Sequence, residues 1–251
     1  MALGIIGTGN LGRALARGLG EPVLVSDALH ERAAALAAEL GGEAVASNAE
    51  LARRADVVLL CHKPDLLEAV AAETDGGARA IISCVGATTV AQLEAAYPGV
   101  PVVRVLPNTA LEVGEAVTAI AAQRGADTEL HARARSLFSR VGSVVVVPEE
   151  AMLLAQVSSG AMPAYVSLVA EALVDALVRR GLDAETAGAL VVGSMPGAAR
   201  LVAHTGMDTL GVRRAVTSPG GTTARALAAL EAGALRATVS RAMDAALGEP
   251  V

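Results

Sequence analysis

Short apolar runs rich in β-branched residues alternate with Ala- and Leu-rich stretches through the first half of the 251-residue chain. Apolar residues between Leu29 and Leu40 recur at helical spacing, which predicts a helix that covers one face of a sheet. Strands that alternate with helices pair in parallel through crossovers, so we expect an α/β, doubly wound sheet. The apolar runs predict its first strands at Leu3–Ile6, Val23–Val25, Val57–Cys61, Ala80–Ser83 and Val102–Val105.

The same pattern continues as far as Pro148. Val117–Ala121 and Val144–Val147 are predicted as two further strands, on either side of a helix from Thr128 to Phe138. Pro148 then closes the strand pattern, because proline cannot donate a hydrogen bond to a sheet.

Beyond Pro148 the periodicity becomes helical. Apolar residues from Val166 to Leu177 mark a long amphipathic helix that ends near Gly181, and helical spacing continues to about Leu247. We therefore predict an α/β domain at residues 1–148 and an all-α domain at residues 149–251.

The mean hydropathy of +0.50 raises the question of a membrane span. Residues Ala151–Ala170 carry no charge, and that length could cross a bilayer. The stretch contains Gln156, Gly160 and Pro163, which are unfavourable in lipid or in a helix. We expect a buried helix preceded by a loop, no membrane contact, and apolar surface that is covered between subunits.

Composition excludes several classes of protein. The formal net charge is −6, there is no basic run and no Trp, and the aromatic residues are Phe138, Tyr97 and Tyr165, so we expect no nucleic-acid partner. The N-terminal residues lack the basic start and long apolar core of a signal peptide. Cys61 and Cys84 lie in apolar contexts typical of free thiols, which together predicts a cytoplasmic protein.

A glycine-rich motif, Gly7-Thr8-Gly9-Asn10-Leu11-Gly12, follows the first strand and opens a helix. The first glycine permits a tight turn, the second lets a pyrophosphate approach the backbone, and the third lets helix and strand pack closely. Asp27 lies twenty positions after Gly7, as this fingerprint requires. The N-terminal domain is therefore predicted to be a Rossmann-type domain that binds a dinucleotide; the alternative is a glycine-rich turn without a ligand.

Asp27 bears on which dinucleotide is bound. A carboxylate at the end of the second strand can bind the ribose 2′-hydroxyl of NAD and would repel the 2′-phosphate of NADP. His30 and Arg32 could receive that phosphate if Asp27 turned away, or Asp27 could simply cap the helix that begins near Leu29. The cofactor is predicted to be NADPH or NADH, with a preference for NADH.

The residues Cys61-His62-Lys63-Pro64 end the strand Val57–Cys61, at the sheet edge where α/β proteins bind ligands. Lys63 is the only lysine in the chain. A compact ammonium near the ribose or nicotinamide is a role that arginine could not fill. The alternative is an exposed loop lysine without a function.

A second glycine-rich segment, Ser218-Pro219-Gly220-Gly221-Thr222-Thr223, leads into a predicted helix. Two glycines free the backbone, Thr222 or Thr223 can cap the helix, and successive N–H groups there suit a small carboxylate. An ordinary capped helix is the alternative.

Other chemistries find no support in the sequence. It contains no GxSxG, P-loop or HExxH motif. The histidines have no metal-ligand spacing, so no metal site is predicted. Glu149 could face a cleft or simply favour a helix N-terminus.

With these segments in place the chain resembles the pyrroline-5-carboxylate reductase family over nearly its whole length. The resemblance rests on the glycine-rich motif, on shorter motifs in both domains, and above all on residues 216–223. The shorter motifs are Asn48 followed by Ala55-Asp56-Val57-Val58, His62-Lys63-Pro64, Arg104-Val105-Leu106-Pro107-Asn108-Thr109, Ser159-Gly160, Pro163-Ala164-Tyr165 and Leu227, Leu230, Glu231.

The resemblance implies reduction of 1-pyrroline-5-carboxylate, a cyclic imine carboxylate, to L-proline by NADPH or NADH, the last step of proline biosynthesis. It implies that the helical domain forms an intertwined homodimer whose cleft uses both subunits, and such dimers often assemble further. Ser218 and the Gly220–Thr223 backbone would hold the substrate carboxylate, the Thr223 hydroxyl would reach the imine nitrogen, and Glu149 would lie near the substrate. The residues implied at the cofactor are Gly7, Thr8, Gly9, Asn10, Leu11, Gly12, Ser26, Asp27, Asn48, Cys61, His62, Lys63, Pro64 and Gly86.

The sequence departs from the family pattern at several positions near the expected site. Met162 stands where a glycine is usual, Val85-Gly86-Ala87 replaces Ala-Ala-Gly, and Ser26-Asp27 replaces a polar residue and arginine. Two alternatives follow: a paralogous reductase of another cyclic imine, or a catalytically silent nucleotide-binding protein. Substituting Met162→Gly would shift substrate preference in the first case, and nucleotide binding without turnover would mark the second.

Overall fold

The computed structural model describes residues 2–122 and 128–249. Their internal contacts divide the chain into two compact units, Met1–Pro163 and Ala164–Val251. The last strand ends at Pro148, where the sequence pattern changes. The helical segment that follows, up to Pro163, belongs to the first unit because it packs against the strand Ala116–Ala122.

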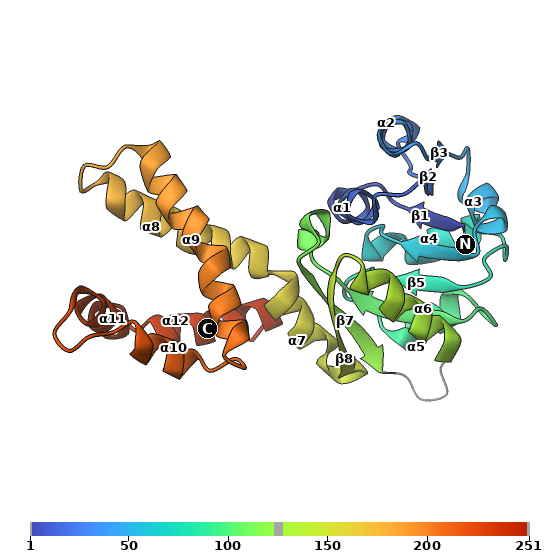
Figure 1. The fold of residues 1–251 in the computed structure, drawn as a ribbon. Helices are drawn as coiled ribbons and strands as arrows, with labels where there is room; N and C mark the ends of the chain where they lie inside the picture. Colours follow the sequence, from blue (N-terminus) through green and yellow to red (C-terminus); the bar gives the residue numbers. More distant parts are fainter. Residues whose placement is uncertain (1, 123–127, 250–251) are drawn as a thin grey trace. The chain divides into compact units, whose positions relative to one another are not determined.

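The described part of the first unit forms an eight-stranded sheet in the order β3-β2-β1-β4-β5-β6-β7-β8 (Figure 1). The sequence predicted seven of these strands to within two residues at either end. It missed β3, a two-residue edge strand without an apolar run. The strands are β1 (Leu3–Ile6), β2 (Leu24–Ser26), β3 (Glu43–Ala44), β4 (Val57–Leu60), β5 (Ile81–Ser83), β6 (Val102–Leu106), β7 (Ala116–Ala122) and β8 (Gly142–Pro148).

Strands β1 to β6 pair in parallel, as the alternation of strands and helices predicted. Strand β7 instead runs antiparallel to β6. The link between them holds one short 3-10 helix, Thr109–Val113, which is too short for a parallel crossover. Strand β8 is again parallel to β7, because a full helix, α6 (Thr128–Ser139), connects the two.

Helices cover both faces of the sheet. Helices α1 (Asn10–Leu19), α2 (His30–Leu40) and α6 pack on one face. Helices α3 (Asn48–Arg54), α4 (Leu67–Glu73) and α5 (Val90–Ala96) pack on the other. The chain therefore forms the doubly wound α/β layers expected from its sequence.

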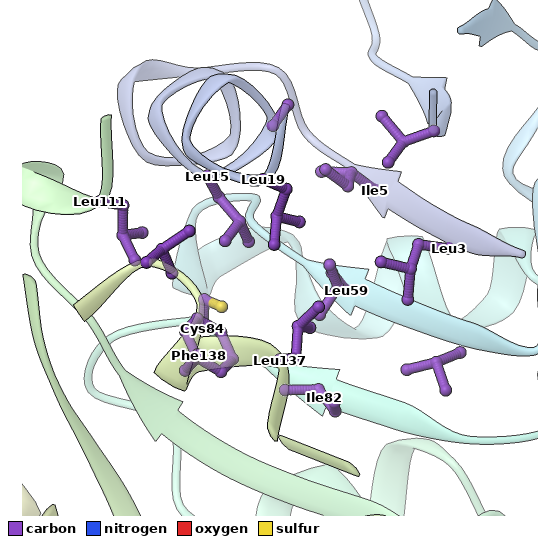
Figure 2. Packing of buried hydrophobic residues seen from close by; sticks show 14 of the residues in the cluster. Leu3, Ile5, Leu15, Leu19, Leu59, Ile82, Cys84, Leu111, Leu137 and Phe138 are labelled. Carbon is purple, nitrogen blue, oxygen red and sulfur yellow. The ribbon is translucent and has the colours of Figure 1, made fainter. Parts of the chain in front are cut away.

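The core follows from the alternation of side chains along each strand. Leu59 belongs to the cluster under α1, and the next residue, Leu60, belongs to the cluster on the opposite face; both are fully buried. Figure 2 shows the first cluster, in which side chains of α1 and α6 meet those of the central strands. Burial on both faces explains why these strands are continuous apolar runs.

The segment before the long helix is not the loop that the sequence predicted. It is helical throughout: a 3-10 turn at Glu149–Ala151, α7 (Met152–Ala155), a π-helical turn at Gln156–Gly160, and then α8 (Met162–Val178). Pro163 is tolerated because it lies in the first turn of α8, where backbone N–H groups have no helical partner.

The second unit continues α8 with α9 (Ala184–His204), α10 (Thr209–Ala215), α11 (Thr222–Ala232) and α12 (Leu235–Leu247). The prediction that α8 is buried is wrong for the single chain, since no residue of α8 is buried. Large apolar side chains stay open to solvent, including Leu168 at 66% and Leu190 at 58% exposure. This unit therefore has little core of its own.

In the described part of the chain, two helical stretches, Glu149–Val178 and Ala184–His204, are long and apolar enough to cross a membrane by length and composition. The core helices of soluble proteins meet the same criterion, so this finding is weak evidence by itself. A second protein surface packed against these helices would bury the same apolar side chains without a membrane.

Candidate active site

The turn between β1 and α1 is shaped by its three glycines. Gly7 has a φ of +97°, and a Cβ there would lie 2.8 Å from the backbone carbon of Cys61. A Cβ on Gly12 would lie 2.0 Å from the carbonyl oxygen of Gly7. A Cβ on Gly9 would meet nothing within 4 Å, so the space beside Gly9 is open.

Gly9 is also the N-cap of α1, and no side chain within residues 2–122 and 128–249 caps the helix. The first N–H groups of α1 therefore keep their hydrogen-bonding capacity at the positive end of the helix dipole. An anion can approach them across the open side of Gly9.

Asp27 directly follows β2 and is tied to this turn. Its Oδ2 accepts hydrogen bonds from the Thr8 backbone N–H at 2.7 Å and the Thr8 hydroxyl at 2.8 Å, and its Oδ1 accepts one from Leu29 N–H at 2.9 Å. Partial burial acts to raise the pKa of Asp27, but these hydrogen bonds and the nearby Arg32 lower it overall. Asp27 is not the N-cap of α2, because that position is Leu29.

A cavity of about 660 Å³ lies beside the turn, at the carboxyl ends of β1, β2 and β4. This is the point where the strand order reverses direction, because β2 lies on one side of β1 and β4 on the other. Eight of the residues predicted at a cofactor line this cavity: Gly7, Gly9, Ser26, Asp27, Asn48, Cys61, His62 and Lys63.

The remaining residues predicted at the cofactor do not line the cavity wall: Thr8, Asn10, Leu11, Gly12, Pro64 and Gly86. Thr8 is fully buried behind Asp27, and Gly12 packs against Gly7. Gly86 lies beside Gln156, whose side-chain oxygen accepts a hydrogen bond from Ala87 N–H at 3.3 Å. Their roles at a cofactor stay predictions.

Sequence reasoning missed several lining residues, among them Ser47 and Glu73. The Ser47 hydroxyl caps α3 by accepting from Glu50 N–H at 3.1 Å, and this S-x-x-E pattern could have been recognised. Asn48 joins two other cavity residues: its Oδ1 accepts from the Ser26 hydroxyl at 2.6 Å, and its Nδ2 donates to Glu73 at 2.5 Å. No local sequence signal marks Glu73.

His62 presents a free ring nitrogen to this region. Its Nδ1 lies 2.8 Å from the Lys63 carbonyl oxygen, which can only accept, so Nδ1 carries the proton. Its Nε2 is buried and has no hydrogen-bond partner within the described residues. Burial lowers the pKa of His62, which keeps the ring neutral and leaves Nε2 as an acceptor for a ligand hydroxyl.

These features fit a dinucleotide. A Cβ at Gly7 or Gly12 would clash with neighbouring backbone atoms, so this cradle, formed by Gly7–Gly12, requires glycine at both positions. No side chain of the described residues caps the N-terminus of α1, and the buried acceptor at His62 Nε2 has no partner among them. Hydroxyl, amide and carboxylate groups at Ser26, Asn48 and Asp27 line the same cavity. Each of them can bind part of a ribose or phosphate.

Glu149 begins the helical segment after β8. Its Oε1 accepts from Arg104 at 2.7 Å and from Val90 N–H at 3.0 Å, and its Oε2 is buried without a partner in the described residues. Arg104 lies in β6 and is 5% exposed. Glu149 thus joins β6, the start of α5 and the segment after β8.

The segment Ser218–Thr223 belongs to the second unit. Gly220 adopts a φ of +69°, and Gly221, with an extended backbone, is the N-cap of α11. The prediction that Thr222 or Thr223 caps the helix is wrong, because both already lie inside its first turn. Among the residues that the structure describes, no side chain caps α11, so the N–H groups of its first turn remain available to a carboxylate.

Comparison with known proteins covers both units. A family model described as pyrroline-5-carboxylate reductase dimerisation matches residues 149–249. A second, described as NADP oxidoreductase, coenzyme F420-dependent, matches residues 2–86.

Similar proteins span nearly the whole chain. The pyrroline-5-carboxylate reductase of Corynebacterium melassecola is 35% identical over 97% of this chain and 95% of its own length. The crystal structure of Plasmodium falciparum pyrroline carboxylate reductase with NADP bound matches with a TM-score of 0.86, 28% identity, and coverage of 98% and 95%. The Streptococcus pyogenes 1-pyrroline-5-carboxylate reductase matches with a TM-score of 0.88, 29% identity, and coverage of 99% and 97%.

Proposed function

The chain belongs to the pyrroline-5-carboxylate reductase family, and we propose that it reduces 1-pyrroline-5-carboxylate to L-proline with NADPH or NADH. The observation that carries this proposal is the 35% identity across 97% of the chain to a reductase of that activity. The glycine cradle and the cavity at the carboxyl ends of the strands support it independently.

The first unit supplies the cofactor site. The uncapped N-terminus of α1 and the space beside Gly9 hold the pyrophosphate. His62 Nε2 would accept a hydrogen bond from a ribose hydroxyl, and Lys63 lines the same cavity. When bound, the reduced nicotinamide supplies the hydride.

The second unit supplies groups for the substrate. The N–H groups of Thr222 and Thr223, which have no helical partner at the start of α11, bind the imine carboxylate together with Ser218. The Gly221 N–H donates to the Ser218 carbonyl oxygen at 3.0 Å, which fixes the Gly220–Gly221 backbone beside them. The Thr223 hydroxyl donates to or accepts from the imine nitrogen. A C=N bond is already polarised, so the protein has to orient the reactants and needs no nucleophile.

We infer a preference for NADH over NADPH. Asp27 is held ionised and fixed by three hydrogen bonds at the cavity wall, where a 2′-phosphate would meet its charge. Arg32 lines the same cavity and opposes this preference. The related Plasmodium enzyme holds NADP, so the ratio of the two activities has to be measured for this chain.

The helical unit works as a homodimer. Its family model describes dimerisation, and the exposed apolar side chains of α8 and α9 fit burial against a second copy. We propose that the dimer covers these side chains and that the chain makes no membrane contact. We also propose a cytoplasmic location, which agrees with the free thiols of Cys61 and Cys84.

The test is oxidation of NADH and, separately, NADPH, with and without racemic 1-pyrroline-5-carboxylate. Imine-dependent oxidation is expected with both, together with proline formation. Thr223→Val, which removes one hydroxyl at nearly constant shape, should lower kcat by about a hundredfold. Thr238→Val on the exposed face of α12 is the matched control. Dinucleotide binding without turnover of the imine would overturn the proposal.

A further inference from the structure

The two cysteines of the chain are neighbours at the carboxyl ends of adjacent strands. Leu60 pairs with Ser83 across β4 and β5, and Cys84 N–H donates to the Leu60 carbonyl at 2.9 Å, so the next residues along, Cys61 and Cys84, face each other. Both side chains belong to the same face of the sheet, with Cys61 packed against the cluster that contains Cys84. Cys61 raises the pKa of the Cys84 thiol, which agrees with this adjacency.

The two thiols differ in access. Cys61 is half-buried and lines the cavity beside the glycine-rich turn. Cys84 is 4% exposed and lies within the apolar cluster, as Figure 2 shows. A reagent that enters the cavity therefore meets Cys61 and not Cys84, which lies beside it in the core.

Cys61 also supports the cofactor cradle. Its backbone passes 2.8 Å from where a Cβ on Gly7 would stand, and its own Cβ is 3.3 Å from where a Cβ on Gly12 would stand. Cys61 is therefore in close contact with the turn. Closing a disulfide requires its side chain to turn toward Cys84, and that movement changes the wall of the cavity that Cys61 lines.

We propose that Cys61 and Cys84 form an oxidisable dithiol, in which a hydroperoxide attacks at Cys61, Cys84 closes a disulfide, and dinucleotide binding is lost. The loss of binding rests on the proposed cofactor site, whereas the disulfide itself does not. The modification is reversible by thiol reductants.

The chemistry balances in two steps. The Cys61 thiolate attacks one peroxide oxygen, the O–O bond breaks, and the departing oxygen takes a proton to leave as water, or as an alcohol from an alkyl hydroperoxide. Cys61 is then a sulfenic acid. The Cys84 sulfur attacks the Cys61 sulfur, the S–O bond breaks, and the hydroxide leaves as water with the Cys84 proton. Two thiols have lost two electrons, and the peroxide has gained them.

The order of the steps follows from the surroundings of Cys84. Its hydrogen bond with Cys61 and its burial raise the pKa of the Cys84 thiol well above its ordinary value, so Cys84 stays protonated and does not react first. Adjacent strands lie about 5 Å apart, which falls within the Cα separation that a disulfide spans. Any movement needed to close the disulfide takes place at the carboxyl ends of β4 and β5, next to the glycine-rich turn.

The experiment treats the full-length, reduced protein with hydrogen peroxide in the absence and presence of saturating NADPH. Intact mass and peptide mapping after alkylation should show an intramolecular Cys61–Cys84 disulfide. Bound dinucleotide should slow its formation by about tenfold or more, because it occupies the cavity. NADPH fluorescence titration of the oxidised protein should show affinity reduced by about tenfold or more, restored by dithiothreitol.

Cys84→Ala separates the two steps, since alanine replaces a small buried side chain without a thiol. This variant should keep imine reduction, accumulate a Cys61 sulfenic acid that dimedone traps, and form no disulfide. If Cys84→Ala fails to fold, the wild-type mapping alone decides.

Two thiols still free in peroxide-treated wild type, or a disulfide only between chains, would overturn the proposal. An internal disulfide that leaves NADPH affinity unchanged would overturn its effect on binding. Neither readout depends on imine turnover, so failure of the proposed activity would be seen separately.

Discussion

One carboxylate oxygen of Asp27, at the end of β2, holds the glycine-rich turn through two hydrogen bonds from Thr8. Asp27 Oδ2 accepts from both the Thr8 N–H, at 2.7 Å, and the Thr8 hydroxyl, at 2.8 Å. The carboxylate is therefore both fixed in position and kept ionised, because each hydrogen bond favours its charged form. A side chain that orders the turn thus also sets the charge at the cofactor cavity.

Removing that charge should change cofactor preference. In Asp27→Asn the amide oxygen can still accept from Thr8, but its NH₂ group cannot accept from Leu29 N–H. The ratio of kcat/KM for NADPH to that for NADH should rise about tenfold, because a negative charge near the 2′-phosphate is gone. Initial rates with each cofactor at fixed imine concentration measure this ratio.

Arg32 provides the converse test. Arg32→Gln should lower the same ratio, since the cation lines the cavity beside Asp27. Arg79→Gln is the control, as Arg79 is exposed and pairs with Asp56 at the opposite ends of the strands. An unchanged ratio in both Asp27→Asn and Arg32→Gln would place the 2′ position of the ribose elsewhere.

The glycines of the turn should separate folding from binding. Gly12→Ala puts a methyl 2.0 Å from the Gly7 carbonyl oxygen, so helix and strand must move apart and stability should fall by about 2 kcal/mol or more. Gly9→Ala meets nothing within 4 Å, so stability should be nearly unchanged while dinucleotide affinity falls. Thermal unfolding and fluorescence titration of both variants check this; equal loss of affinity without destabilisation in Gly12→Ala would contradict it.

Local sequence patterns predicted most of the first unit because its strands are buried on both faces. Residues such as Leu59 and Leu60 must both be apolar, which makes each strand a visible run. The short strand β3 and the antiparallel turn into β7 were not predicted, since they depend on an edge position and on loop length. The helical turns at 149–161 were missed because polar and glycine residues there suggested a loop.

The candidate site was predictable where a motif marks it and unpredictable where only the fold assembles it. The spacing from Gly7 to Asp27 is fixed by one β-α-β unit, so the sequence alone indicated both. Glu73 reaches the cavity from the end of α4 through its bond to Asn48, a contact that no local pattern encodes. The burial expected for α8 was wrong for a single chain, because the sequence does not separate a chain's own core from an interface.

His62 should make stability depend on pH. Burial lowers its pKa below the ordinary value of 6.5, so the unfolded chain binds a proton more readily than the folded one. The stability that neutral His62 contributes to the fold is therefore fully present above pH 6.5 and is lost as the pH falls below 6.5. The melting temperature of wild type should fall more than that of His62→Asn between about pH 7 and about pH 5. From about pH 8 to about pH 7 the difference between the two should stay constant, and parallel curves throughout would refute the role.

Arg104, which is buried, and Glu149, which is half-buried, form an ion pair whose disruption should be costly from either side. The Arg104 side chain is 6% exposed and the Glu149 side chain 30% exposed, and Arg104 Nη1 lies 2.7 Å from Glu149 Oε1. Arg104→Met leaves the Glu149 carboxylate partly buried without its cation, and should destabilise the first unit by about 2–3 kcal/mol after allowance for solvent at Glu149. Arg236→Met, which removes an exposed cation from the second unit, is the control and should leave that transition unchanged.

The double variant distinguishes a structural pair from a substrate contact. If Glu149 serves mainly to neutralise Arg104, adding Glu149→Leu to Arg104→Met should recover at least about 1 kcal/mol, because both buried charges are then gone. Activity should recover in parallel, since the segment after β8 is again anchored. If Glu149 instead contacts the imine, the double variant will regain stability but not kcat/KM. Denaturant unfolding and steady-state kinetics on wild type, Arg104→Met, Glu149→Leu and the double variant give the two answers independently.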